Sequence, residues 1–291
     1  MTARATLPIL CVLAGVAGLS LMDAFMKSAA LATGTFTATW LRSILGFALV
    51  APVWLLGRGP LVTKGAMRLH LLRGTVSTAM ALTFFYALTK LPIAEAIAIS
   101  FVAPLIALYL ARILLDETIS RAAVRASLLG FAGTVVVAAG RLGSGAITTD
   151  TLLGLAAITV SAVLYAYNFI VIRQQSQAAS PIEIAAFHSG VPSVLLLFAA
   201  PFYFTMPEPQ IAFDLVAAAL LTIFGALCLA WAYARAQAQL LVPLEYSGFA
   251  WASVFGWLFF RETVEPATLV GTALIVAGSW MAARNGRTDA G

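Results

Sequence analysis

The sequence predicts an all-α integral membrane protein in which ten transmembrane helices form two inverted five-helix repeats. Three observations lead to this fold class. The composition is too apolar for a water-facing surface, the apolar residues fall into ten segments of membrane-spanning length, and the two halves of the chain are weakly self-similar.

The composition excludes an ordinary soluble protein. Of the 291 residues, 62% are hydrophobic and 10% are charged, and the mean hydropathy is +0.97. Soluble domains carry roughly a quarter charged residues because their surface faces water, whereas a bilayer solvates apolar side chains directly. The 17 basic residues outnumber the 12 acidic ones, but they are scattered singly, so we expect no nucleic-acid partner.

Apolar stretches of about 20 residues match the thickness of a bilayer. Short connections separate them, several of which contain Pro or Gly, and no connection is long enough for a separate soluble domain. The predicted spans are 7–26, 36–57, 67–89, 92–115, 122–140, 152–172, 183–206, 211–234, 242–260 and 265–283.

The basic residues predict the orientation, because cytoplasmic loops carry an excess of Lys and Arg. With both termini cytoplasmic, the side facing outward holds Lys27, Lys90, Arg141 and Arg261, while Arg42 lies within the second span. The cytoplasmic ends hold the remaining basic residues, which are Arg4, Arg58, Lys64, Arg68, Arg73, Arg112, Arg121, Arg125, Arg173, Arg235, Arg284 and Arg287. We therefore expect a multi-pass protein with both termini in the cytoplasm.

The two halves repeat short motifs in the same order. Asp116-Glu117-Thr118 ends the fourth span and Arg261-Glu262-Thr263 ends the ninth, while Gly74 and Pro92 correspond to Gly225 and Pro243. The repeats are predicted at 1–145 and 146–291. Since each half has an odd number of spans, the second half runs inverted through the membrane, which is an architecture of transporters that work by alternating access.

Two segments resemble the drug/metabolite transporter superfamily in its ten-helix form with two EamA-type repeats. They run from Phe101-Val-Ala-Pro104 through Asp116-Glu117 and from Val242-Pro243 through Arg261-Glu262, and Arg42 also fits the family pattern. The resemblance implies secondary transport of a small metabolite through a central cavity, with spans five and ten as scaffold. Within the superfamily, the chain is most similar to bacterial inner-membrane exporters of amino acids, including aromatic ones.

Charged residues inside spans are expensive and therefore candidates for substrate binding. Asp23 is predicted to bind a substrate ammonium group or a coupling proton, or else to pair with Lys27 four residues later. Arg42 either meets a carboxylate or extends to the membrane interface. Glu95 follows Pro92 and either binds substrate or stabilises a helix start.

Aromatic residues with polar groups, and one amide, complete the predicted substrate-binding set. Such side chains stack on an apolar or aromatic substrate and hydrogen-bond a zwitterion. Asn168 lies three residues after Tyr165, on one helix face. The full set is Asp23, Arg42, Tyr86, Glu95, Tyr165, Asn168, Trp231, Tyr246 and Trp251. Pro104 is predicted as a hinge in the fourth span, but the ninth span has no proline at the same distance before its Glu.

The leading functional prediction is a secondary transporter that exports small metabolites, most consistent with apolar or aromatic amino acids. The alternative is a carrier of riboflavin, a nucleobase or another metabolite, including in the uptake direction. Catalytic residues, a metal and cofactors are not expected, because no HExxH, GxSxG or GxxxxGK[ST] motif appears. An enzyme or channel is therefore the weakest interpretation, and protons remain a candidate coupling ion.

Overall fold

The computed structural model describes residues 3–57, 62–115, 121–143, 148–235, 241 and 244–285. It is all-helical in this part of the chain, as predicted. The first half contains α1 (Ala3–Thr33), α2 (Thr35–Leu56), α3 (Lys64–Lys90), α4 (Ile93–Ser100), α5 (Ala103–Leu115) and α6 (Arg121–Gly143). The second half contains α7 (Thr149–Ala178), α8 (Pro181–Leu197), α9 (Ala200–Tyr203), α10 (Pro209–Tyr233), α12 (Ser247–Phe260) and α13 (Pro266–Asn285).

The ten predicted spans correspond to these helices. Six helical stretches of the described chain are long and apolar enough to cross a membrane, and four shorter apolar helices account for the remaining spans. Two predicted spans each consist of two helices: α4 and α5 together form the fourth span, and α8 and α9 form the seventh. The predicted boundary between the repeats, at residue 145, lies outside the described residues.

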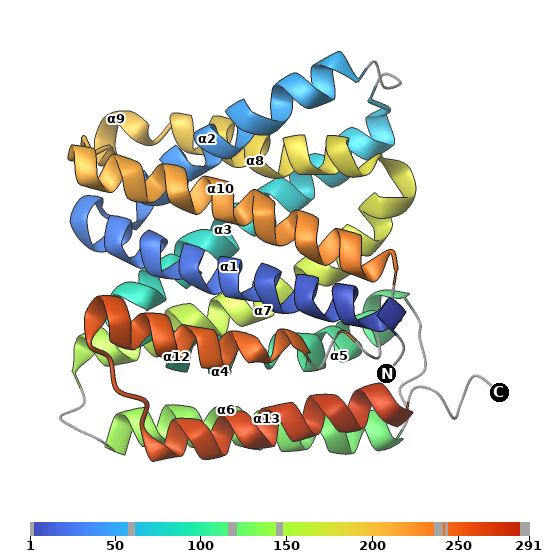
Figure 1. Cartoon of the computed structure of the whole chain (residues 1–291), viewed down its shortest axis with the longest axis vertical. Coiled ribbons are helices and arrows are strands. Elements are labelled where there is room, and N and C mark those ends of the chain that lie inside the picture. Colours follow the sequence, from blue (N-terminus) through green and yellow to red (C-terminus); the bar gives the residue numbers. More distant parts are fainter. Residues whose placement is uncertain are drawn as a thin grey trace.

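The helices run roughly parallel to one another, so the bundle has two ends (Figure 1). We call the end at which α1 begins and α13 ends the terminal face, and the other end the opposite face. Capping residues define several helix starts at these faces. Thr63 accepts from the N–H of Ala66 at the start of α3, and Ser180 accepts from Glu183 at the start of α8.

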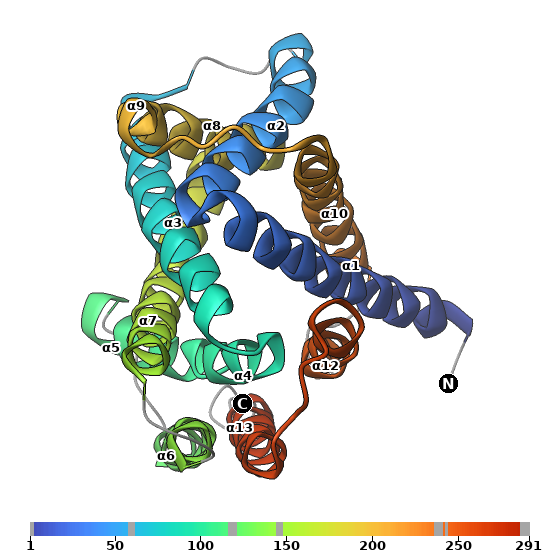
Figure 2. The ribbon, with the colours of Figure 1, turned by 90° about the vertical axis from the view of Figure 1, so that its left-hand side faces the viewer.

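The helix pairing has the symmetry of an inverted repeat. If each helix of the first half matches the helix five spans later, the packing of α1 on α10 corresponds to that of α7 on α3, and both pairs are present. The pairs α2–α8, α4–α12 and α6–α13 correspond to themselves and are also present. The view down the bundle in Figure 2 shows α6 and α13 side by side at its edge.

The α6–α13 pair is held by close backbone approach. A Cβ on Gly133 would lie 2.5 Å from the carbonyl oxygen of Gly271, and a Cβ on Gly271 would lie 2.6 Å from that of Gly133. Small residues at a crossing let membrane helices pack tightly without a hydrophobic driving force. Spans five and ten therefore form a peripheral pair, while the remaining helices surround the centre (Figure 2).

Candidate functional site

Two interrupted helices meet at the centre of the bundle. The fourth span breaks at Phe101 and Val102, three residues before Pro104, which lies in the first turn of α5. The ninth span turns at Tyr246 before α12 begins. The rings of Phe101 and Tyr246 contact each other edge to face, with centroids 4.9 Å apart. Interrupted helices expose backbone groups at mid-membrane depth, which is tolerated where they are buried in protein or line a cavity.

The ninth span is interrupted even though it has no proline that matches Pro104. The absence of a proline matching Pro104 placed a hinge in the ninth span in doubt. In the structure, the helix of this span is interrupted at Tyr246. Pro243 lies outside the described residues. Both halves thus contribute a broken helix to the centre, as an inverted repeat requires.

The first span passes directly beside these breaks. The hydroxyl of Ser20 on α1 donates to the carbonyl of Gly248 over 3.4 Å. A Cβ on Gly248 would lie 3.3 Å from Val16 and 3.9 Å from the ring of Phe101. Asp23 follows Ser20 by three residues and therefore lies on the same side of α1. It is only 7% exposed.

Asp23 and Arg42 form a pair of opposite charges between α1 and α2. Each lies within electrostatic range of the other. The Nη1 of Arg42 donates to the hydroxyl of Thr222 on α10 at 3.5 Å, and its guanidinium lies 5.5 Å from the ring centroid of Phe85. Its Nε is buried without a hydrogen-bond partner in the described chain. The guanidinium therefore keeps unused donor capacity for an anionic group.

The predicted alternative for Asp23, an ion pair with Lys27, is wrong. The Nζ of Lys27 contacts the carboxylate of Glu262 and donates to the carbonyl of Leu91 at 2.7 Å. Lys27 lies near the opposite end of α1, where the ends of three helices converge on it. A spacing of four residues places two side chains on one face, but here stronger partners from other helices take up the ammonium group.

An accessible inner surface lies on α7. Val163 is 46% exposed, and with Val160 it marks the side of α7 that faces lipid. Tyr165 and Phe169 project about 160° and 120° away from Val163 around the helix, yet they are 38% and 36% exposed. The hydroxyl of Tyr165 lies within electrostatic range of Glu245 and Asp23, which belong to other helices. The exposed surface of Tyr165 therefore faces the interior of the bundle.

Along the described part of α7, this inner surface is more exposed toward the terminal face. On the same face of α7, Gly154 packs against Lys90 and Leu91, and Ile158 is completely buried. Since α7 runs from the opposite face to the terminal face, burial gives way to exposure along its length. We call Asp23, Arg42, Phe101, Tyr165 and Tyr246 the central site.

Among the other predicted binding residues, Tyr86, Trp231 and Trp251 have their contacts outside the central site. Tyr86 lies near the opposite end of α3, where the Nζ of Lys90 is 5.9 Å from its ring. Trp231 lies under the guanidinium of Arg235 and, with Trp251, packs against an apolar cluster around Val12. Asn168 is 6% exposed. Of the nine predicted residues, the structure thus brings together Asp23, Arg42, Tyr165 and Tyr246.

Glu95 belongs to a charged cluster that joins helix ends at the opposite face. The carboxylate of Glu262 bonds Lys27 and also accepts from the backbone N–H of Ile93 at 2.8 Å. Arg141 on α6 lies 3.7 Å from both Glu95 and Glu265. We call Lys27, Glu95, Arg141, Glu262 and Glu265 the opposite-face latch, because they join α1, α4, α6, the end of α12 and the start of α13.

A second buried polar network lies at the terminal face and was not predicted. His70 on α3 contacts Glu183 on α8 at 2.7 Å and Gln175 on α7 at 2.6 Å, and Arg73 donates to Gln175 at 2.9 Å. All four side chains are less than 10% exposed. The network joins α3, α7 and α8. The signal in the sequence was the position of His70, Arg73 and Glu183 at the ends of apolar runs.

His188 on α8 also lies near Arg42. It is within electrostatic range of both Arg42 and Arg73, and its Nδ1 is buried without a hydrogen-bond partner in the described chain.

The protein has about ten membrane spans in two inverted halves, and two interrupted spans meet at its centre beside buried charges. These features are typical of a secondary carrier. The family model described as the EamA-like transporter family matches residues 6–139 and again residues 152–284. The chain belongs to this family, within the drug/metabolite transporter superfamily. It is therefore a membrane transporter of a small metabolite rather than an enzyme.

Some curated relatives carry a substrate in their names. The chain is 25% identical over 260 residues to the pseudopaline exporter CntI of Pseudomonas aeruginosa strain UCBPP-PA14, covering 88% of this chain and 89% of the relative. It is 25% identical over 217 residues to a riboflavin transporter of Brucella anthropi, covering 72% and 74%. A solved structure, described only as "Crystal structure of protein", matches with a TM-score of 0.64 and 22% identity, covering 95% of this chain and 98% of that one. This last likeness supports the fold.

Proposed function

We propose that this transporter exports a small zwitterion with an apolar or aromatic side chain, which in chemical class is an amino acid. The observation that carries the proposal is the central site, where Asp23 and Arg42 present opposite charges beside aromatic rings. A zwitterion brings an ammonium group for the carboxylate and a carboxylate for the guanidinium, so both buried charges gain a partner on binding. The rings of Phe101, Tyr165 and Tyr246 offer surface for an apolar side chain.

The proposed direction follows from charge and accessibility together. The basic residues of the sequence are concentrated at the terminal face, which we therefore assign to the cytoplasm. The inner surface around Tyr165 is accessible toward that face, while the latch joins the helix ends at the other. A substrate is thus taken up from the cytoplasm and released after the latch opens, by alternating access. The match to an exporter over most of the chain agrees with this direction.

A second candidate substrate is a larger aromatic metabolite such as riboflavin. The match to a riboflavin transporter and the aromatic residues of the central site favour it. The two candidates differ in how they would use Asp23. An amino acid has an ammonium group that binds the Asp23 carboxylate, whereas a substrate without an ammonium group does not. The effect of Asp23 on transport therefore separates the two candidates.

The first experiment is a counterflow assay with the purified protein in liposomes. Vesicles loaded with an unlabelled amino acid are diluted into labelled Phe, Leu, Met or Thr, and transient accumulation is measured. We expect saturable accumulation of Phe or Leu that depends on the internal substrate. If accumulation appears only with riboflavin or nucleobases, the amino-acid proposal fails and the second candidate replaces it.

A further inference from the structure

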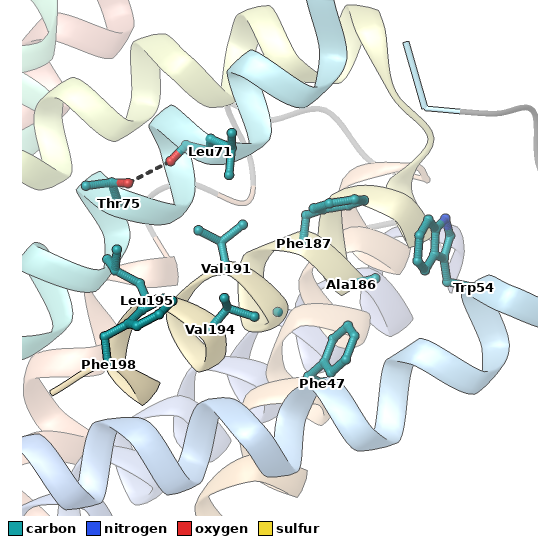
Figure 3. Close-up of a pocket in the computed structure, with 11 residues that line it drawn as sticks. Phe47, Trp54, Leu71, Thr75, Ala186, Phe187, Val191, Val194, Leu195 and Phe198 are labelled. Carbon is teal, nitrogen blue, oxygen red and sulfur yellow. Dashed lines mark hydrogen bonds between the residues drawn. The ribbon is translucent and has the colours of Figure 1, made fainter. Parts of the chain in front are cut away.

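A pocket of about 340 Å³ lies between α2, α3 and α8 (Figure 3), and none of the central-site residues lines it. Phe47 and Trp54 line it from α2, Leu71 and Thr75 from α3, and Phe187 and Val194 from α8. The hydroxyl of Thr75 already donates to the carbonyl of Leu71 at 2.9 Å. The pocket thus offers an almost purely apolar lining, which does not suit the zwitterion proposed for the centre.

The pocket opens toward the hydrocarbon of the bilayer. Leu71 and Val194 are 51% and 59% exposed, although they belong to helices that cross the membrane. Exposed apolar side chains at this depth contact lipid tails rather than water. Of the molecules around the protein, an acyl chain is the one with the chemistry and the access to fill this pocket.

Two cations lie along the same face of α3 as the pocket lining. Lys64, Arg68, Leu71 and Thr75 are spaced by four, three and four residues, which aligns them in one stripe. Arg68 and Lys64 lie about 4.5 and 10 Å from Leu71 along the helix axis, toward the terminal face. Both are exposed, and neither forms an ion pair within the described residues.

An apolar pocket followed by two cations toward the membrane surface matches the acyl chain and the anionic headgroup of one phospholipid. We propose that the pocket holds an acyl chain of an anionic phospholipid whose phosphate is bound by Arg68 and Lys64. A guanidinium binds a phosphate through paired donors, and basic sites between membrane helices are suited to anionic headgroups. Trp54 lies two residues before the end of α2, the depth at which indole rings meet the headgroup region.

The lipid would contact a side chain that supports the buried network at the terminal face. Phe187 lines the pocket and stacks on His70, with ring centroids 4.2 Å apart and planes at 11°. His70 in turn bonds Glu183 and Gln175. A bound acyl chain therefore packs against the joint of α3, α7 and α8 and stabilises the folded protein, because it binds the folded state alone.

The experiment measures thermal unfolding of the full-length protein in detergent with added lipid. Dioleoyl phosphatidylglycerol, which is anionic, is titrated against dioleoyl phosphatidylcholine, which is zwitterionic with the same chains. We expect the anionic lipid to raise the melting temperature at lower concentration. In Arg68→Gln and Lys64→Gln this preference weakens, by about fivefold in the half-maximal concentration for each cation removed.

Filling the pocket tests the acyl-chain part of the site. Val194→Trp places an indole in the pocket from the lipid side, and we expect the response to phosphatidylglycerol to be lost. Leu71→Trp serves the same purpose if the first variant does not fold. Val163→Trp on the lipid-facing side of α7 is the matched control and should respond like the unmodified protein, as should Arg235→Gln, which removes an exposed cation elsewhere on the terminal face.

Three outcomes would overturn the proposal. They are an unchanged preference for phosphatidylglycerol in the double variant Lys64→Gln/Arg68→Gln, an unchanged response in both pocket-filling variants, and an equal effect of inorganic phosphate alone. These readouts do not involve transport, so they stand whether or not the amino-acid assignment is correct.

Discussion

At the scale of single residues, the important feature is the buried charge at the centre. Arg42 has five donors, of which one reaches Thr222 over a long 3.5 Å contact, while its Nε has no hydrogen-bond partner in the described chain. A buried donor without an acceptor destabilises the empty protein and is satisfied when a carboxylate arrives. Asp23, which is only 7% exposed and lies within electrostatic range of Arg42, is the matching acidic group for an ammonium group.

Removing either charge should therefore impair substrate binding. Asp23→Asn and Arg42→Gln keep the size of the side chain and are expected to reduce counterflow by roughly tenfold or more. Rates are compared in liposomes with equal amounts of protein. Asp150→Asn is the control, because Asp150 pairs with Lys90 and its side chain is 64% exposed at the opposite face. Unchanged counterflow in both Asp23→Asn and Arg42→Gln would contradict the central role of this pair.

The sequence identified Asp23 and Arg42 because a charge within an apolar run is conspicuous. It did not separate Tyr165, which faces the interior, from Tyr86, which lies beside Lys90 near the opposite face. Sequence gives the depth of a residue along a span, whereas the rotation of the helix is set by its neighbours. Phe101 was missed for a related reason, since phenylalanine is common on lipid-facing surfaces.

At the scale of helices, the opposite-face latch acts on helix ends. Glu262 accepts from the N–H of Ile93, which begins α4 and has no partner within the helix, while Lys27 donates to the carbonyl of Leu91, which ends α3. One ion pair thus joins α1 and α12 to the turn between α3 and α4. The sequence showed Glu262 as half of a repeated motif but not its partner, which lies 235 residues away.

Breaking this ion pair should open the opposite face. Lys27→Gln leaves Glu262 without its cation, and we expect a cysteine placed at Ala94, which is only 4% exposed, to react several-fold faster with a membrane-impermeant maleimide. Lys90→Gln disrupts an exposed ion pair nearby and should leave the labelling rate unchanged. Equal rates in Lys27→Gln and the parent protein would show that the latch does not control access.

The break in the fourth span makes a separate prediction about motion. Pro104 lies in the first turn of α5, where the absence of an N–H favours the interruption at Phe101 and Val102. Pro104→Ala allows a more continuous helix and is expected to lower the counterflow rate several-fold while the protein remains folded. Full transport with unchanged accessibility on both faces would reject Pro104 as a hinge.

The α6–α13 pair makes a prediction about stability. A Cβ on Gly133 would meet the backbone of α13, including the carbonyl oxygen of Gly271 at 2.5 Å, so Gly133→Ala must push the two helices apart. We expect a loss of about 1–3 kcal/mol in stability, seen as a lower melting temperature in detergent. Gly143→Ala is the matched control, because no other part of the described chain lies within 4 Å of its added Cβ. Equal melting temperatures would mean that close packing here contributes little.

At the scale of the whole molecule, the two halves are related by symmetry, but the two ends of the bundle differ. Short motifs in the sequence were sufficient to predict two inverted halves, because these motifs recur in the same order in both halves of the chain. They did not predict which end is closed. That difference arises from contacts between the halves, such as Lys27 with Glu262, and from the inner face of α7, where Ile158 is buried and Tyr165 is exposed.

The asymmetry can be tested with two cysteines placed two residues apart on α7. In a background with Cys11 and Cys228 replaced by alanine, Tyr165→Cys should react with an impermeant maleimide from the terminal face, because Tyr165 is 38% exposed on the inner side of α7. Val163→Cys faces lipid and should remain unreactive from either side. Inside-out and right-side-out membrane vesicles distinguish the two faces. Labelling of Tyr165→Cys only in inside-out vesicles, slowed by the transported amino acid, would place the terminal face in the cytoplasm and the substrate beside α7. Labelling only from the outside would reverse the proposed direction of opening, since the inner surface would then lead away from the cytoplasm.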